Sequence, residues 1–179
     1  GTGVGGGIIL NGKILTGSNG AAGEIGHLFV NPHETRTCGC GKKGCLEQYS
    51  SATGITRMSA EKLESTDTPS ELRQYDHPIT GLELFKAYKN DDALAKEIVD
   101  TFSSYLGKGL SHVAAVVDPQ AFVIGGGVSN QGETLLAPIR KYVEEETKNI
   151  TTGKMPAIRA CVLTNDAGVI GAAALANSI

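Results

Sequence analysis

Short apolar runs separated by turn residues open the chain. Residues 8–10 and 13–16 are apolar runs on either side of Asn11-Gly12, a pattern that predicts a β-hairpin. A third apolar run, Leu28-Phe29-Val30, predicts another short strand. Residues 31–45 are polar and rich in Gly and Cys, so we expect a loop there.

Helical spacing of apolar residues takes over further along the chain. Helices are expected over residues 52–63, 82–88, 92–117, 135–146 and 166–176. The helix over 92–117 is the longest and should end at Asp118-Pro119, while Gly107 and Gly109 within it mark close packing. Asn165 is expected to cap the last helix.

Two apolar segments between the later helices predict strands. Residues 121–124 have the length and composition of a buried strand, and residues 157–163 predict a second one. Cys161 lies in this second strand, where we expect a plain core thiol. Strands that alternate with helices indicate an α/β layered fold, and 179 residues suffice for one domain.

Composition and charge exclude several classes of protein. The net charge of −3 and the pI near 5.8 argue against a nucleic-acid partner, including a zinc-ribbon module. No apolar run approaches the ~18 residues of a membrane span, and no secretion signal opens the chain, so a reducing cytoplasm is expected. Because the chain starts at Gly1 without Met and directly within a motif, we expect it to be a piece of a longer protein.

Glycine is the compositional outlier, with 24 residues that occur in clusters. The first cluster is Gly1-Thr2-Gly3-Val4-Gly5-Gly6-Gly7, whose backbone N–H groups could face phosphate oxygens; the alternative is a flexible hairpin edge. The second is Gly125-Gly126-Gly127, between a predicted strand and a helix. Ligands bind at such strand ends in open α/β sheets, although the segment could equally be a simple turn.

Three cysteines within eight residues suit a metal better than a disulfide framework. Cys38, Cys40 and Cys45, together with His27, make a complete tetrahedral set for a structural Zn2+. His33 competes with His27 as the fourth ligand, and the spacing alone leaves both open.

Two carboxylates flank this cysteine loop. Glu24 precedes it and Glu47 follows it. Carboxylates accept hydrogen bonds well from sugar hydroxyls, yet either residue alone could equally be a surface or helix-end charge.

Taken in order, these segments resemble the ROK family of sugar kinases and sugar-responsive repressors. The resemblance covers nearly the whole chain: 3–8, Gly23-Glu24-Ile25-Gly26-His27, 38–47, 125–129 and 165–173. Within the family, the pattern is closest to members that phosphorylate glucose.

The resemblance implies an actin-like, hexokinase-type (ribonuclease H-like) fold, of which residues 1–179 would form the larger C-terminal lobe with a zinc-stapled loop. Residues 1–7 would contact the ATP phosphates and residues 125–127 the adenosine. His27 would be both a zinc ligand and a sugar contact, and Glu24 and Glu47 would accept hydrogen bonds from the sugar. Mg2+ would arrive with ATP, and a homodimer is expected.

One departure from the family pattern is large. The N-terminal domain, with its Asp-x-Gly-x-Thr segment and the aspartate that acts as general base, is absent from these 179 residues. We therefore expect no catalytic residue in this chain, ATP-dependent phosphorylation of glucose at the 6-hydroxyl only in the full-length protein, and no turnover by this chain alone. The alternatives are a sugar-sensing repressor of the same family, or a kinase for N-acetylmannosamine, mannose or fructose.

Overall fold

A computed structural model describes residues 2–149 and 155–176. The helices are α1 (Ala52–Ser65), α2 (Gly81–Lys89), α3 (Ala93–Val117), α4 (Glu133–Thr147) and α5 (Ala167–Ala176). The strands are β1 (Ile9–Leu10), β2 (Lys13–Ile14), β3 (Ala121–Ile124) and β4 (Ala157–Ala160). Short 3-10 helices span Ile25–His27, Leu46–Gln48, Glu71–Gln74, Gly127–Gln131 and Thr164–Asp166. Within this part of the chain, no helix has the length and apolar character needed to cross a membrane.

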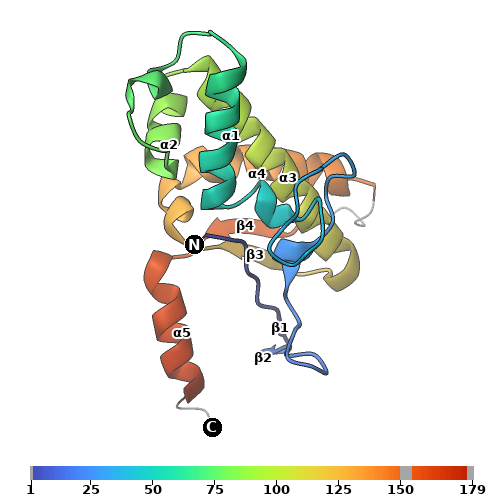
Figure 1. The fold of residues 1–179 in the computed structure, drawn as a ribbon. Helices are drawn as coiled ribbons and strands as arrows, with labels where there is room; N and C mark the ends of the chain where they lie inside the picture. The colour runs from blue at the N-terminus through green and yellow to red at the C-terminus, as the bar shows by residue number, and fades with distance from the viewer. Residues whose placement is uncertain (1, 150–154, 177–179) are drawn as a thin grey trace.

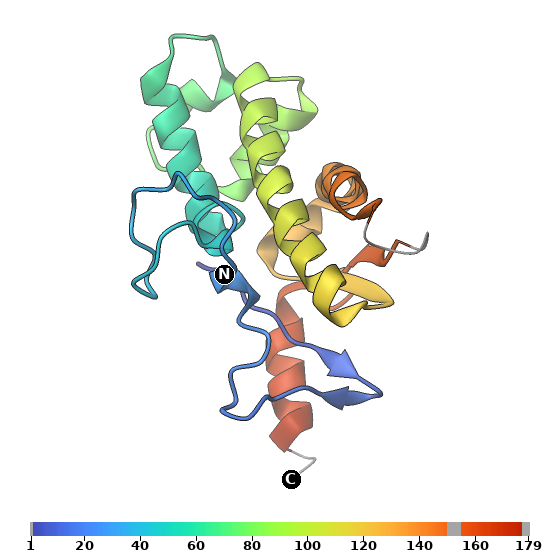
Figure 2. The same cartoon turned by 90° about the vertical axis from the view of Figure 1, so that its right-hand side faces the viewer.

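The predicted hairpin forms at the start of the chain. Strands β1 and β2 pair antiparallel, with Ile9 opposite Ile14. Asn11 and Gly12 both have positive φ, of 52° and 76°, as a tight two-residue hairpin turn requires. The hairpin projects away from helices α1 to α4, on the same side as α5, in Figures 1 and 2, and both strands are exposed.

Helix α3 is the centre of the core. Its N-cap is Asp92, whose side chain accepts a hydrogen bond from the Ala95 amide, and its C-cap Asp118 is left-handed with φ 47°. The helix packs against α1, α2 and α4, as Figures 1 and 2 show. Gly107 and Gly109 do mark close packing, because a Cβ on them would meet Tyr142 at 2.5 Å and Leu46 at 2.6 Å. Leu46 is fully buried, so α3 supports the segment that follows the cysteine loop.

Strands β3 and β4 pair in parallel and are joined through α4, which makes a β-α-β unit under the helices (Figure 1). The prediction that residues 121–124 are buried was wrong: Val123 is 64% exposed, while Phe122 and Ile124 pack against the core. One face of this two-stranded pair is covered by helices and the other is open.

Two other predictions differ from the structure. Residues 28–30 form no strand; Phe29 makes an isolated antiparallel bridge to Cys45, which closes the base of the cysteine loop. Strand β4 ends at Ala160, so Cys161 lies just beyond it and is half-buried rather than in the core. The backbone at position 165 lies inside the 3-10 helix Thr164–Asp166, but its side chain lies outside the described part of the structure, so the cap of α5 stays a prediction. Helix α5 points away from the other helices in both views.

Candidate functional site

Two local structures bring the predicted ligands together. The 3-10 helix Ile25–His27 carries His27, and the loop 31–45 carries the cysteines. The loop is closed at its base, where the Val30 amide donates to the Gly44 carbonyl oxygen (2.8 Å). The ligand atoms of His27, Cys38, Cys40 and Cys45 consequently all lie within 4.8 Å of one another. His33 is exposed and is not part of this cluster.

The distances within the cluster fit a tetrahedral metal ion. Tetrahedral zinc places neighbouring ligand atoms about 3.6–3.8 Å apart, given its bond lengths to sulfur and nitrogen. Cys40 Sγ and Cys45 Sγ are 3.6 Å apart, and Cys38 Sγ lies 3.8 Å from His27 Nδ1. Three thiols and one imidazole also match the donor set that zinc prefers. The residues present therefore fit Zn2+.

The three thiols have different proton affinities. Burial raises the pKa of Cys38 to about 12, and burial likewise raises the pKa of Cys45. A hydrogen bond from the Lys42 backbone lowers the pKa of the exposed Cys40. Because a metal binds thiolates, its binding at this cluster would release protons and would weaken as the pH falls.

Both predicted carboxylates face the same imidazole. Glu24 Oε2 lies 3.9 Å from His27 Nε2, and Glu47 Oε1 lies 3.7 Å from His27 Nδ1. Glu47 also accepts a hydrogen bond from Cys38 Sγ (2.9 Å). The Glu24 side chain is 68% exposed and the Glu47 side chain 23%, so both retain free acceptor oxygens beside the cluster.

The N-terminal glycine segment runs directly past these groups. A Cβ on Gly3 would lie 2.5 Å from Glu47 Oε2, and one on Gly6 would lie 2.7 Å from the Gly23 carbonyl oxygen. A Cβ on Gly5 or Gly7 would meet nothing within 4 Å, so this part of the segment is open to a ligand. The predicted contact at Gly1 lies outside the described residues.

The second glycine segment follows β3, at the carboxyl end of the parallel pair. Gly125 lies beside Cys161, and a Cβ on Gly127 would meet nothing within 4 Å. The 3-10 helix Gly127–Gln131 begins at the last of these glycines, and Ser129 Oγ within it donates to the Gly126 carbonyl oxygen (2.7 Å). The predicted strand-to-helix turn is therefore present. The two glycine segments contact different parts of the chain: the first lies against Gly23 and Glu47, and the second against Cys161.

Sequence reasoning missed a buried polar group next to the cluster. Glu34 lies in the loop with a side chain that is only 3% exposed, and it pairs with Arg36 and with the Tyr49 hydroxyl. The hydrogen bonds from Arg36 and Tyr49 hold the pKa of Glu34 well below its usual range. A glutamate and an arginine in a polar loop are typical of exposed positions, so the pattern of residues carried no signal for this burial.

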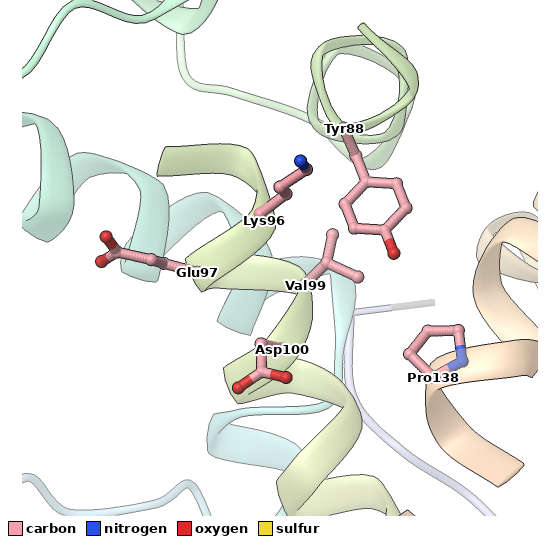
Figure 3. Close-up of a pocket in the computed structure, with 6 residues that line it drawn as sticks. All are labelled: Tyr88, Lys96, Glu97, Val99, Asp100 and Pro138. Carbon is pink, nitrogen blue, oxygen red and sulfur yellow. The ribbon is translucent and has the colours of Figure 1, made fainter. Parts of the chain in front are cut away.

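A separate hollow of about 370 Å³ lies between α2, α3 and α4 (Figure 3). Its lining residues are Tyr88, Lys96, Glu97, Val99, Asp100 and Pro138. No predicted site residue belongs to it, and it is open to solvent. The chemistry-bearing groups are instead gathered around His27.

Comparison with known proteins places this geometry in a family. The ROK family model matches residues 1–179. The glucokinase of Halalkalibacterium halodurans is 44% identical over 174 residues, which cover 96% of this chain and 52% of that protein. The N-acetylmannosamine kinase of Escherichia fergusonii is 33% identical over 175 residues, covering 98% of this chain and 54% of that protein.

A solved structure is similar over the whole chain. The ROK family glucokinase from Streptomyces griseus, in complex with glucose and AMPPNP, matches with a TM-score of 0.90 and 35% identity, covering 100% of this chain and 59% of that one. The chain thus spans about half the length of the curated relatives it matches. Its fold is that of the ROK sugar kinases, and the chain belongs to the ROK family.

Proposed function

We propose that this chain is the C-terminal lobe of an ATP-dependent sugar kinase that phosphorylates glucose at its 6-hydroxyl. The observation that carries the proposal is the placement of one imidazole, His27, between two carboxylates and within reach of three cysteine thiols. Identity of 44% to a glucokinase, in a chain of the same family, supports glucose as the sugar.

The carboxylates would recognise the sugar. Glu24 and Glu47 retain acceptor oxygens, and sugar hydroxyls are donors that would fill them. A bound sugar would shield these oxygens from water, so a ligand that lacks the matching hydroxyl would leave them unpaired and bind more weakly. His27 would add a third polar contact, whose orientation the cysteine cluster holds.

A zinc ion bound by His27, Cys38, Cys40 and Cys45 would act as a structural staple for the loop. The placement of the sugar-binding groups would come from the residues of the chain. His27 presents its other nitrogen toward Glu24, and Glu47 stands against the glycine segment at Gly3. Loop, carboxylates and glycine segment are thereby held as one unit.

The nucleotide would be bound by backbone. Residues 1–7 would donate N–H groups to the phosphates of ATP, with Mg2+ arriving on those phosphates. Residues 125–127 would leave room for the adenosine, since Gly127 opens to free space. The general base that takes the proton of the 6-hydroxyl would come from the N-terminal domain of the full-length protein. A homodimer in the cytoplasm is part of the same proposal.

The test uses the full-length protein that contains this chain. With ATP and Mg2+, glucose 6-phosphate formation is followed through a coupled dehydrogenase, and mannose, fructose and N-acetylmannosamine are compared by ADP release. Glucose should give the highest kcat/KM, and residues 1–179 alone should give none. Turnover of glucose by residues 1–179 alone would overturn the lobe assignment.

N-acetylmannosamine is the second candidate substrate, because a relative at 33% identity is named for its phosphorylation. A higher kcat/KM for N-acetylmannosamine than for glucose would select that activity. Absence of any phosphorylation, together with a helix-turn-helix in the sequence upstream, would instead favour a sugar-responsive repressor.

A further inference from the structure

The cysteine loop contains a buried carboxylate, that of Glu34, and both of its oxygens accept hydrogen bonds. Glu34 Oε1 accepts from the Arg36 amide and from Arg36 Nε, both at 2.8 Å. Its Oε2 accepts from Arg36 Nη2 at 2.7 Å and from the Tyr49 hydroxyl at 2.5 Å. A carboxylate that is 3% exposed is retained in a protein only when it is paired in this way.

Tyr49 joins the beginning of the loop to the segment that follows the loop. Its hydroxyl donates to Glu34 and accepts from Asn31 Nδ2 (2.8 Å), so both of its hydrogen-bonding functions are used. Its ring stacks on Tyr105 with centroids 3.9 Å apart. Tyr49 follows Glu47 by two residues, at the end of the 3-10 helix Leu46–Gln48.

Gln48 makes a second connection between the same segments. Its Nε2 donates to the Arg36 carbonyl oxygen (3.1 Å), and its Oε1 accepts from the Cys45 amide (3.0 Å). The beginning of the loop, before Cys38, is thus bonded to Gln48 and Tyr49, the two residues that follow Glu47. These bonds reach the cluster residues only at the backbone amide of Cys45, and none of them involves a ligand atom of the cluster.

We propose that Glu34 is a positioning residue for sugar binding: acting through Tyr49, it fixes the loop 31–45 and the Glu47 carboxylate in the geometry that the sugar requires. The inference rests on the proposed function. A buried ion pair contributes little to stability compared with apolar packing, but its directional bonds fix the relative placement of the segments they join. Glu34 has such bonds to both segments.

The chain provides a matched control. Arg36 also pairs with Glu61 of α1, on the solvent side, where the Glu61 side chain is 50% exposed. Glu61→Gln therefore removes a carboxylate from the same arginine, and from Arg57, while leaving both hydrogen-bond partners of the Tyr49 hydroxyl in place. Tyr49→Phe removes the hydroxyl while keeping the ring that stacks on Tyr105.

The experiment measures glucose and ATP kinetics of the full-length protein for Glu34→Gln, Tyr49→Phe, their double variant and Glu61→Gln. We expect the KM for glucose to rise about tenfold in the first two variants, as when a partner of a site ligand is removed, with the kcat and the KM for ATP unchanged. The double variant should resemble the singles, because both act through one bond. Glu61→Gln should resemble the wild type.

A second readout does not depend on activity. Amide hydrogen exchange of residues 31–48 should accelerate in Glu34→Gln and Tyr49→Phe, while exchange in α3 should not. Unchanged exchange would overturn the inference, and so would a faster-exchanging loop with an unchanged KM for glucose. If the wild type phosphorylates no sugar, the proposed function fails and the sugar part of the inference fails with it, whereas the exchange comparison still decides whether Glu34 holds the loop.

Discussion

The backbone of Gly26 lies against the carbonyl oxygen of Val4, so close that a methyl group on Gly26 would be 2.0 Å from that oxygen. Gly26 is buried in the 3-10 helix that carries His27, and Val4 belongs to the N-terminal glycine segment. A second crossing lies next to it, between Gly6 and Gly23. The segment proposed for phosphate binding and the one proposed for sugar and metal binding are therefore packed as a single unit.

Gly26→Ala should disrupt this unit. The added methyl group cannot be accommodated without moving backbone, and overpacking of this kind costs about 1–3 kcal/mol. We expect a lower urea midpoint and, in the full-length protein, higher KM values for both glucose and ATP. Gly7→Ala is the control, because a Cβ there meets nothing within 4 Å, and its stability should stay within about 0.5 kcal/mol of the wild type. Equal stability of the two variants would contradict the prediction.

Local patterns predicted the local structures of this chain. The Asn11-Gly12 hairpin and the long helix beginning after Asp92 were predicted correctly, because turn chemistry and helical periodicity act over a few residues. The clustering of the three cysteines with a histidine was also predicted from spacing, while the choice of His27 over His33 came from the resemblance to the ROK family. Its occupation by zinc and the roles of Glu24 and Glu47 stay predictions.

What the patterns could not predict depended on partners distant in the sequence. The apolar composition of residues 121–124 predicted a buried strand. Burial, however, depends on which elements cover each face of the sheet, and Val123 lies on an exposed face. Phe29 pairs with Cys45 through one bridge rather than forming a strand. Glu34 has the charge of a surface residue, and only the fold brings Tyr49 to it.

Metal content distinguishes a zinc site from three reduced thiols. We expect about one zinc per chain by mass spectrometry of the wild type, with its removal by a chelator lowering the melting temperature. Cys40→Ala should lose the zinc, speed exchange in the loop 31–45 and weaken glucose binding together. Cys161→Ala, a half-buried cysteine outside the cluster, should keep the zinc. A wild type without zinc, or a Cys40→Ala variant that retains it, would refute the metal assignment.

Gly44 and Gly41 provide a matched pair of substitutions in the same loop. Both have positive φ, of 73° and 84°, so alanine at either position costs about 1–2 kcal/mol in backbone strain. At Gly44 the methyl group would also lie 2.1 Å from the Asn31 carbonyl oxygen, whereas at Gly41 it meets nothing within 4 Å. Urea unfolding should therefore find Gly44→Ala the less stable variant, with reduced zinc content. A larger loss for Gly41→Ala would show that the loop is not closed at Asn31.

The buried carboxylate makes stability depend on pH in a defined direction. Hydrogen bonds from Arg36 and Tyr49 hold the pKa of Glu34 well below its usual range in the folded chain, while a glutamate in the unfolded chain has a pKa of about 4.3. The stabilisation by ionised Glu34 is therefore fully present above the unfolded pKa and is lost as the pH falls below it toward the folded one, since the unfolded chain takes up a proton first.

The Glu34→Gln variant lacks the stabilisation by an ionised carboxylate at every pH. The difference in unfolding free energy between wild type and Glu34→Gln should thus be largest near neutral pH and should shrink as the pH falls below about 4.3, measured by urea unfolding across that range. Glu61→Gln removes the exposed partner of Arg36 and should differ little from the wild type at any pH, because surface ion pairs contribute about 0–1 kcal/mol. A difference that stays constant or widens toward acid would mean that Glu34 takes up its proton in the folded chain as readily as in the unfolded one, and its bonds to Arg36 and Tyr49 could then not hold the loop.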